Sequence, residues 1–173
     1  GIYGVRAANG VILIETKKGT LGSKPQLDLS GYYGVQETAR KLDLLNAREY
    51  AILKNEAFAA GGQALPFANV ELGEGTNWQD AVFQQAPIQE YNLTMTGGSE
   101  KTSYSIGGSY FAQDGIVGGA KANFERYNAR INFTTQVAPK LKFSNVLLFT
   151  HEESSGLPQG GIGSVLYNTV NAY

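Results

Sequence analysis

Long stretches of the chain alternate between apolar and polar residues, which is the pattern of a β-strand with one face in an apolar environment. The first is Gln26–Gln36, where Leu27, Leu29, Tyr33 and Val35 fall on one face. Four more follow, at Tyr91–Gly97, Ser103–Phe111, Tyr127–Gln136 and Leu141–Thr150. The pattern therefore predicts an all-β fold with five alternating strands.

The lengths of these strands and of their connections indicate a membrane barrel. The strands run to about ten residues, twice the usual length in globular proteins. Short turns are predicted at Gly97–Lys101 and Val137–Lys140, and longer connections at 36–87, 113–123 and 152–173. Alternation of short and long connections is typical of antiparallel outer-membrane β-barrels, whose apolar face meets lipid and whose polar face lines a wet lumen. Five strands are too few to close such a barrel, so we expect a longer protein.

The N-terminal stretch differs from the rest. Val11–Thr16 is apolar on both faces, which predicts a strand buried on both sides. A Gly- and Asn-rich turn precedes it, and Gly19–Pro25 reads as a linker at a domain boundary. Arg6 in that turn, if buried, needs a carboxylate or carbonyl partner.

One helix, around Asn46–Ala60, is predicted from the residues at its two ends. Asn46 and Glu49 have the spacing of a capping box, and Gly61-Gly62 supplies a stop. By strand parity this helix belongs on the external side, where it could shape the mouth of the barrel. The stretches 63–86 and 152–173 read as loops, apart from a short amphipathic turn at Trp78.

Composition removes several function classes. The 173 residues carry a net charge of −1, which argues against nucleic acid as a partner, and they include no Cys and one His. No stretch approaches the ~20 apolar residues of a membrane helix. His151-Glu152-Glu153 lacks the second His that a metalloprotease requires, and the glycines around Arg6 precede a strand, unlike a nucleotide loop. We therefore expect no enzyme activity, metal or cofactor.

Several motifs, in this order, resemble SusC-like TonB-dependent outer-membrane transporters. The first motif resembles the end of the plug domain in that family, and it includes Tyr3, Gly4, Arg6, Ala7, Asn9 and Gly10. The later ones resemble the segment after the first barrel strand and the second to fourth strands: Leu42–Asn46 with Glu49-Tyr50, Asn77–Asp80, Tyr91–Gly98, Tyr104, Gln113–Ile116 and Phe124–Tyr127.

The resemblance implies that residues 1–22 end a plug and residues 23–173 are the first strands of a barrel of about 22 strands. It implies import of an oligosaccharide or oligopeptide across the bacterial outer membrane. TonB would act through a segment that is absent from this chain, and a SusD-like lipoprotein would cover the mouth. Most aromatic residues fit a lipid-facing girdle. Tyr32, which is out of phase, and Trp78, in a loop, are the candidate ligand or lid contacts.

Two alternatives remain at this stage. A ferric-siderophore or cobalamin receptor would share the plug and barrel but not the lipoprotein lid. A surface-attached β-sandwich that binds carbohydrate would need no membrane, and it predicts a monomer that is stable without detergent.

Overall fold

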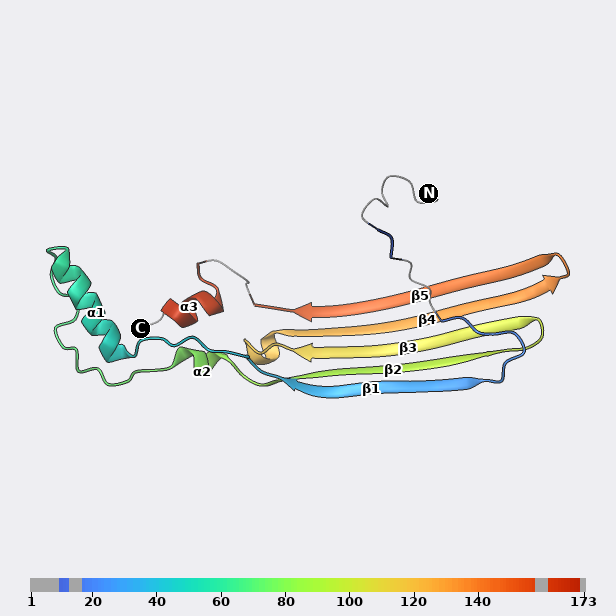
Figure 1. The fold of residues 1–173 in the computed structure, drawn as a ribbon, viewed down its shortest axis with the longest axis horizontal. Helices are drawn as coiled ribbons and strands as arrows, with labels where there is room; N and C mark the ends of the chain where they lie inside the picture. The colour runs from blue at the N-terminus through green and yellow to red at the C-terminus, as the bar shows by residue number, and fades with distance from the viewer. Residues whose placement is uncertain (1–9, 13–16, 158–161, 172–173) are drawn as a thin grey trace. The chain divides into compact units, whose positions relative to one another are not determined.

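A computed structural model describes residues 10–12, 17–157 and 162–171. Five strands form one sheet, in which neighbours in sequence are also neighbours in space (Figure 1). Their bounds are Gln26–Gln36 (β1), Ala86–Gly98 (β2), Thr102–Asp114 (β3), Asn123–Ala138 (β4) and Leu141–Ser155 (β5). The five predicted strands are confirmed, and β1 has the predicted bounds.

Strands β2 to β5 extend beyond their alternating centres. The added residues are mostly polar, such as Gln113 and Glu153, and they continue the ladder because a neighbouring strand supplies hydrogen-bond partners. His151 and Glu153 accordingly lie within β5, and the prediction that a loop begins at Glu152 is wrong.

The structure holds more helices than the sequence pattern indicated. They are α1 (Ala47–Ala60), α2 (Trp78–Val82), the 3₁₀ turn η2 (Gly119–Lys121) and α3 (Val165–Asn171). The predicted capping box of α1 is present, with the Asn46 side chain accepting from the Glu49 N–H and the Glu49 carboxylate accepting from the Asn46 N–H. The loop prediction for 152–173 is wrong again at α3, where the Ser164 Oγ accepts a hydrogen bond from the Tyr167 N–H at 3.2 Å and so caps the first turn.

The predicted strand Val11–Thr16 is described only at Val11 and Ile12, which lie in neither a helix nor a strand. Residues 13–16 lie outside the described part of the chain. So do Tyr3, Gly4, Arg6, Ala7 and Asn9 of the predicted plug motif, and the partner expected for Arg6 is therefore untested.

Large apolar side chains lie on the surface of this sheet. Among the described residues, the buried apolar ones are Ala51 and Ala86, whereas Leu29, Leu147 and Phe149 are 76%, 58% and 60% exposed. A water-soluble domain of this length normally buries its large apolar side chains in a core. The exposed apolar face therefore needs a non-aqueous neighbour. No helix in the described ranges has the length and apolar character to cross a membrane.

The chain divides into two compact units, and each strand contributes one end to each unit. Unit 1 contains the described residues of Gly1–Ser30 with Asn92–Ser109 and Asn128–Thr150. It includes the short β2–β3 and β4–β5 turns. Unit 2 contains Gly31–Tyr91, Tyr110–Tyr127 and the described residues of His151–Tyr173, and it includes all three α-helices.

The face opposite the apolar one is polar and cross-linked in unit 1. The Asn128 side chain donates to Ser109 Oγ at 3.0 Å and accepts from Thr150 Oγ1 at 2.9 Å, which joins β3, β4 and β5. Thr134 donates to Ser144 at 3.1 Å on the same face. These bonds link side chains on adjacent strands, so the alternation seen in the sequence is kept in register across the sheet.

Candidate functional site

The connection between β1 and β2 in unit 2 is a folded module built on α1. The Asn55 side-chain amide makes two hydrogen bonds to the backbone of Phe67, at 2.8 and 3.1 Å. The Phe67 ring meets Tyr50 edge-on at 6.2 Å between centroids. Arg48 approaches Glu71 at 3.4 Å, and the Ala47 N–H donates to the Glu74 carbonyl. Helix α1 and the chain that follows it are thus held together at several points.

A buried glutamine ties the start of this module to α2. Gln79 is 4% exposed, and its amide donates to the Leu42 carbonyl and accepts from the Leu42 N–H, both at 2.7 Å. Lys41 also pairs with Asp80 on the next residue of α2. Asn77 caps α2 by accepting from the nitrogens of Gln79 and Asp80. The geometry of the 41–46 segment therefore depends on α2.

These contacts frame a cavity of about 700 Å³, which we call the Trp78 cavity. It is lined by residues 42–47, Tyr50, 74–79 and 169–171. Trp78, which is 42% exposed, is one of the lining residues, and so are the acidic residues Asp43 and Glu74. The described lining has no Lys, Arg or His. Aromatic faces beside carboxylates suit hydroxyl-rich or cationic groups.

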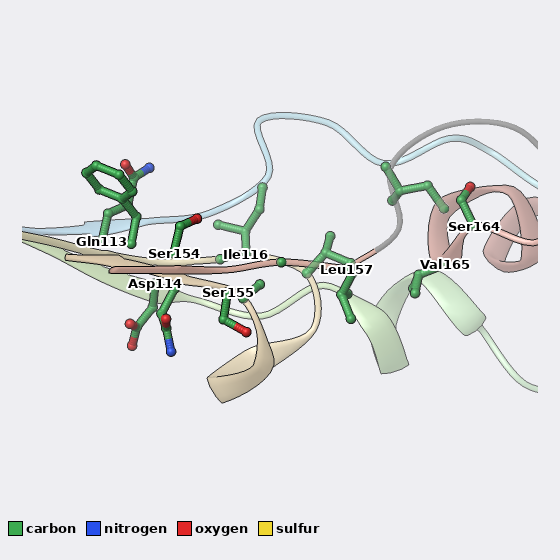
Figure 2. Close-up of a pocket in the computed structure, with 15 residues that line it drawn as sticks. Gln113, Asp114, Ile116, Ser154, Ser155, Leu157, Ser164 and Val165 are labelled. Carbon is green, nitrogen blue, oxygen red and sulfur yellow. The ribbon is translucent and has the colours of Figure 1, made fainter. Parts of the chain in front are cut away.

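A second cavity, of about 480 Å³, lies in unit 2 at the ends of β3, β4 and β5 and at the start of α3 (Figure 2). Ile116, Leu157 and Val165 line it with apolar groups, and Ser154 and Ser155 add hydroxyls. Leu157 packs against Gly118, where a Cβ would come within 2.3 Å of the leucine methyl carbon. Gly118 has a φ of +91°, so a side chain is disfavoured there on both counts.

The two predicted contact residues, Trp78 and Tyr32, do not lie at the same site. Trp78 lines the first cavity, but Tyr32, on β1 and 48% exposed, lines neither cavity. Gly10 is described, has a φ of +101° and has no atom within 4 Å of an added Cβ. The described residues bring no group of three potential metal ligands together, and His151 makes a 3.1 Å contact with Glu153.

Several residues at this site were not indicated by the sequence. Tyr50 and the α3 residues Thr169–Asn171 line the Trp78 cavity. A signal existed for α3, since Ser164 precedes the apolar Val165, Leu166 and Val170, but the flanking glycines obscured it.

Comparison with known proteins identifies relatives of this chain. No protein-family model matches the chain. It is 38% identical over 141 residues to TonB-dependent receptor P3 of Formosa agariphila, covering 82% of this chain and 13% of the relative. It is 35% identical over 132 residues to TonB-dependent receptor SusC of Bacteroides thetaiotaomicron, covering 76% of this chain and 12% of SusC. The chain thus spans about an eighth of the length of these curated relatives.

Among solved structures, a chain of the RagAB peptide transporter superposes with a TM-score of 0.76 and 25% identity. The match covers 98% of this chain and 22% of the transporter chain. A chain of the RagAB peptide importer in its closed-closed state matches the fold with a TM-score of 0.75. The sheet is therefore part of a transporter barrel fold, and the described five strands leave it open.

TonB-dependent receptors such as SusC are outer-membrane proteins and are not enzymes. The predictions of an outer-membrane location and of no enzyme activity are thereby confirmed. Because the sequence matches span most of the chain and the structural match spans nearly all of it, this chain belongs to the SusC-like TonB-dependent receptors.

Proposed function

We propose that this chain forms wall strands of a transporter that imports an oligosaccharide or oligopeptide across the outer membrane, driven by TonB and assisted by a SusD-like lipoprotein. The observation that carries the proposal is a single sheet with one exposed apolar face and one hydrogen-bonded polar face. Such a sheet fits between lipid and a wet lumen. The similarity to SusC and to the RagAB chains supports the same assignment.

The domain division follows from this proposal. Residues 1–22 would end a plug that occludes the barrel, and residues 23–173 would begin the wall. The predicted motif at Tyr3, Gly4, Arg6, Ala7, Asn9 and Gly10 would belong to the plug. No covalent chemistry is required of these residues, because TonB would supply the work by pulling on the plug.

The Trp78 cavity is the proposed ligand or lid contact of this chain. It has the volume of ordinary small-molecule sites and an exposed indole on which a sugar ring or a peptide side chain could stack. Helix α1 borders it through Tyr50 and exposes Leu53, so the lipoprotein could rest on the same module. Tyr32 is a weaker candidate because it lines neither cavity.

Transport is tested in the full-length protein encoded by the gene that contains this sequence. Radiolabelled oligosaccharide and oligopeptide pools are offered to cells with and without TonB and with and without the neighbouring lipoprotein gene. We expect uptake that needs both. Uptake that persists without TonB would contradict the proposal, and uptake that needs TonB but no lipoprotein would favour a siderophore- or cobalamin-type receptor.

The cavity is tested by Trp78→Ala, with Tyr32→Ala as a matched loss of an exposed aromatic ring. We expect the Trp78 variant to raise the half-saturating ligand concentration, or to weaken capture of the lipoprotein, by about tenfold, the worth of one stacked ring. Equal effects of the two substitutions would contradict the proposal that Trp78 contacts the ligand or the lipoprotein.

A further inference from the structure

The linker Gly19–Pro25, here called the connector, is docked onto the β2–β3 turn in unit 1. The Gly22 N–H donates to the Ser99 carbonyl at 2.9 Å, and the Gly98 N–H donates to the Ser23 carbonyl at 3.1 Å. The connector is also folded on itself, since Ser23 Oγ donates to the Thr20 carbonyl at 2.7 Å. It is thus a bound segment rather than a free tether.

Glycines allow the two backbones to approach. A Cβ on Gly19 would lie 2.2 Å from the Tyr104 carbonyl oxygen and 2.6 Å from that of Gly97. A Cβ on Gly98 would lie 2.3 Å from the Thr20 carbonyl oxygen. These neighbours are main-chain atoms, which cannot rotate away as a flexible side chain could. Any side chain at Gly19 or Gly98 therefore forces the connector off the turn.

At Thr20 the connector lies on the polar face of the sheet. A Cβ on Gly97 would meet the Tyr104 ring, 2.5 Å from its hydroxyl, whereas a Cβ on Gly98 would meet Thr20. Successive Cβ atoms of a strand point to opposite faces, so Thr20 and the Tyr104 ring lie on opposite sides.

Ser105 shows how closely this face is covered. It follows Tyr104, which Gly19 contacts, and it is 0% exposed although it belongs to a single-layer sheet. Its hydroxyl has no hydrogen-bond partner among the described residues. Because the connector backbone lies against the neighbouring residue, we take it to be the cover over Ser105.

We infer that the connector stays docked on the β2–β3 turn throughout transport and is the fixed anchor from which the plug moves. This inference rests on the proposed function, because it assumes that TonB pulls on a plug. Only residues that precede Gly19 would then move with the plug, although residues 1–22 are assigned to it. The anchor surface is the polar face of the turn, and its partner is a segment of the same chain.

Ser105→Cys provides a reporter for this docking. The chain contributes no cysteine of its own, and a thiol replaces a buried hydroxyl that lacks a partner, so the variant should fold. In an otherwise cysteine-free full-length transporter, the rate of labelling by a membrane-impermeant maleimide is measured at rest and during TonB-driven uptake. We expect the two rates to agree within about twofold, because labelling requires local opening of the connector. A larger rise that depends on TonB would overturn the anchor.

Two variants show that the reporter responds to the connector. Gly19→Val combined with Ser105→Cys should label at rest at least about tenfold faster, because the valine displaces the cover. Lys24→Val, at an exposed position of the same connector, should leave the rate unchanged. No acceleration with Gly19→Val would also overturn the inference. Uptake by the parent protein that does not need TonB would instead defeat the proposed function, whatever the labelling at rest shows.

Discussion

The two units of the chain are stabilised in different ways, although the same five strands pass through both. Unit 1 has short turns, polar cross-strand pairs such as Asn128 with Thr150, and a connector held by backbone contact. Unit 2 has helices, side chains that bind backbone groups, and both cavities. Under the proposed function, unit 1 would belong to the closed wall and unit 2 to the mouth that meets the ligand, and these roles place different demands on one sheet.

The conformation of the connecting segments in unit 2 depends on individual polar side chains. Gln79 and Asn55 each satisfy both backbone groups of a distant residue, as a strand partner would. In unit 1 the structure is determined mainly by the alternation of apolar and polar residues along the strands. Single side chains there matter less, unless they face the apolar environment.

The largest effect is expected on the apolar face of unit 1. Leu147 and Leu148 are adjacent on β5, 58% and 66% exposed, and point to opposite faces. Leu147→Lys should destabilise the inserted barrel by about 2–4 kcal/mol, the cost of a charge in the middle of the lipid layer. Leu148→Lys should cost little, since under the proposed function its face meets the lumen. The folded fraction of each variant is read from heat-dependent gel mobility, and equal losses would refute the assignment of faces.

The next effect is expected at Gln79 in unit 2. Gln79→Ala removes both hydrogen bonds that the side-chain amide makes to the Leu42 backbone, each of which is worth about 0.5–1.5 kcal/mol. Hydrogen exchange at residues 41–46 should accelerate accordingly, while the strands of unit 1 stay protected. Gln85→Ala, which removes an exposed amide bonded to Glu37, is the matched control. Unchanged exchange at 41–46 would show that Gln79 does not hold this segment.

A smaller effect is expected at the start of α1. Asn46→Ala removes the side-chain cap on Glu49 and should destabilise the helix by about 1 kcal/mol. Asn46→Asp keeps an acceptor and adds a charge that the helix N-terminus favours, so it should restore protection. Faster exchange of the first turn of α1 in the alanine variant alone would confirm the cap, and equal exchange in both would contradict it.

The smallest effect is expected at the Arg48–Glu71 pair. Both side chains are more than half exposed and 3.4 Å apart. Arg48→Ala should therefore change local stability by less than about 1 kcal/mol, and the change should vanish at high salt. A salt-insensitive loss would mean that Arg48 acts through packing rather than through charge.

Much of the fold was predictable because its elements carry local signals. The alternation of β1 gave its bounds, and Asn46 with Glu49 gave the start of α1. The ends of β2 to β5 were not predictable from alternation, because their polar residues are ordered by pairing with neighbouring strands. Helix α3 is short, and the glycines before it imitate a loop.

The site was predictable only in part. Trp78 could be singled out as an isolated aromatic residue in a loop, but the cavity it lines is assembled from segments as far apart in sequence as 42–47 and 169–171. The burial of Gln79 and the close approach of Gly19 to Tyr104 leave no periodic trace in the sequence. Both depend on tertiary contacts between a connecting segment and a distant residue.

One face of this sheet is proposed to meet lipid, and the opposite face is not. Single-cysteine variants at Leu147 and Leu148, each carrying a fluorophore, distinguish the two faces in the full-length protein reconstituted with lipids that bear a quencher on their acyl chains. We expect strong quenching of the label at position 147 and weak quenching at position 148. Equal quenching at the two positions, or none at either, would contradict this proposal.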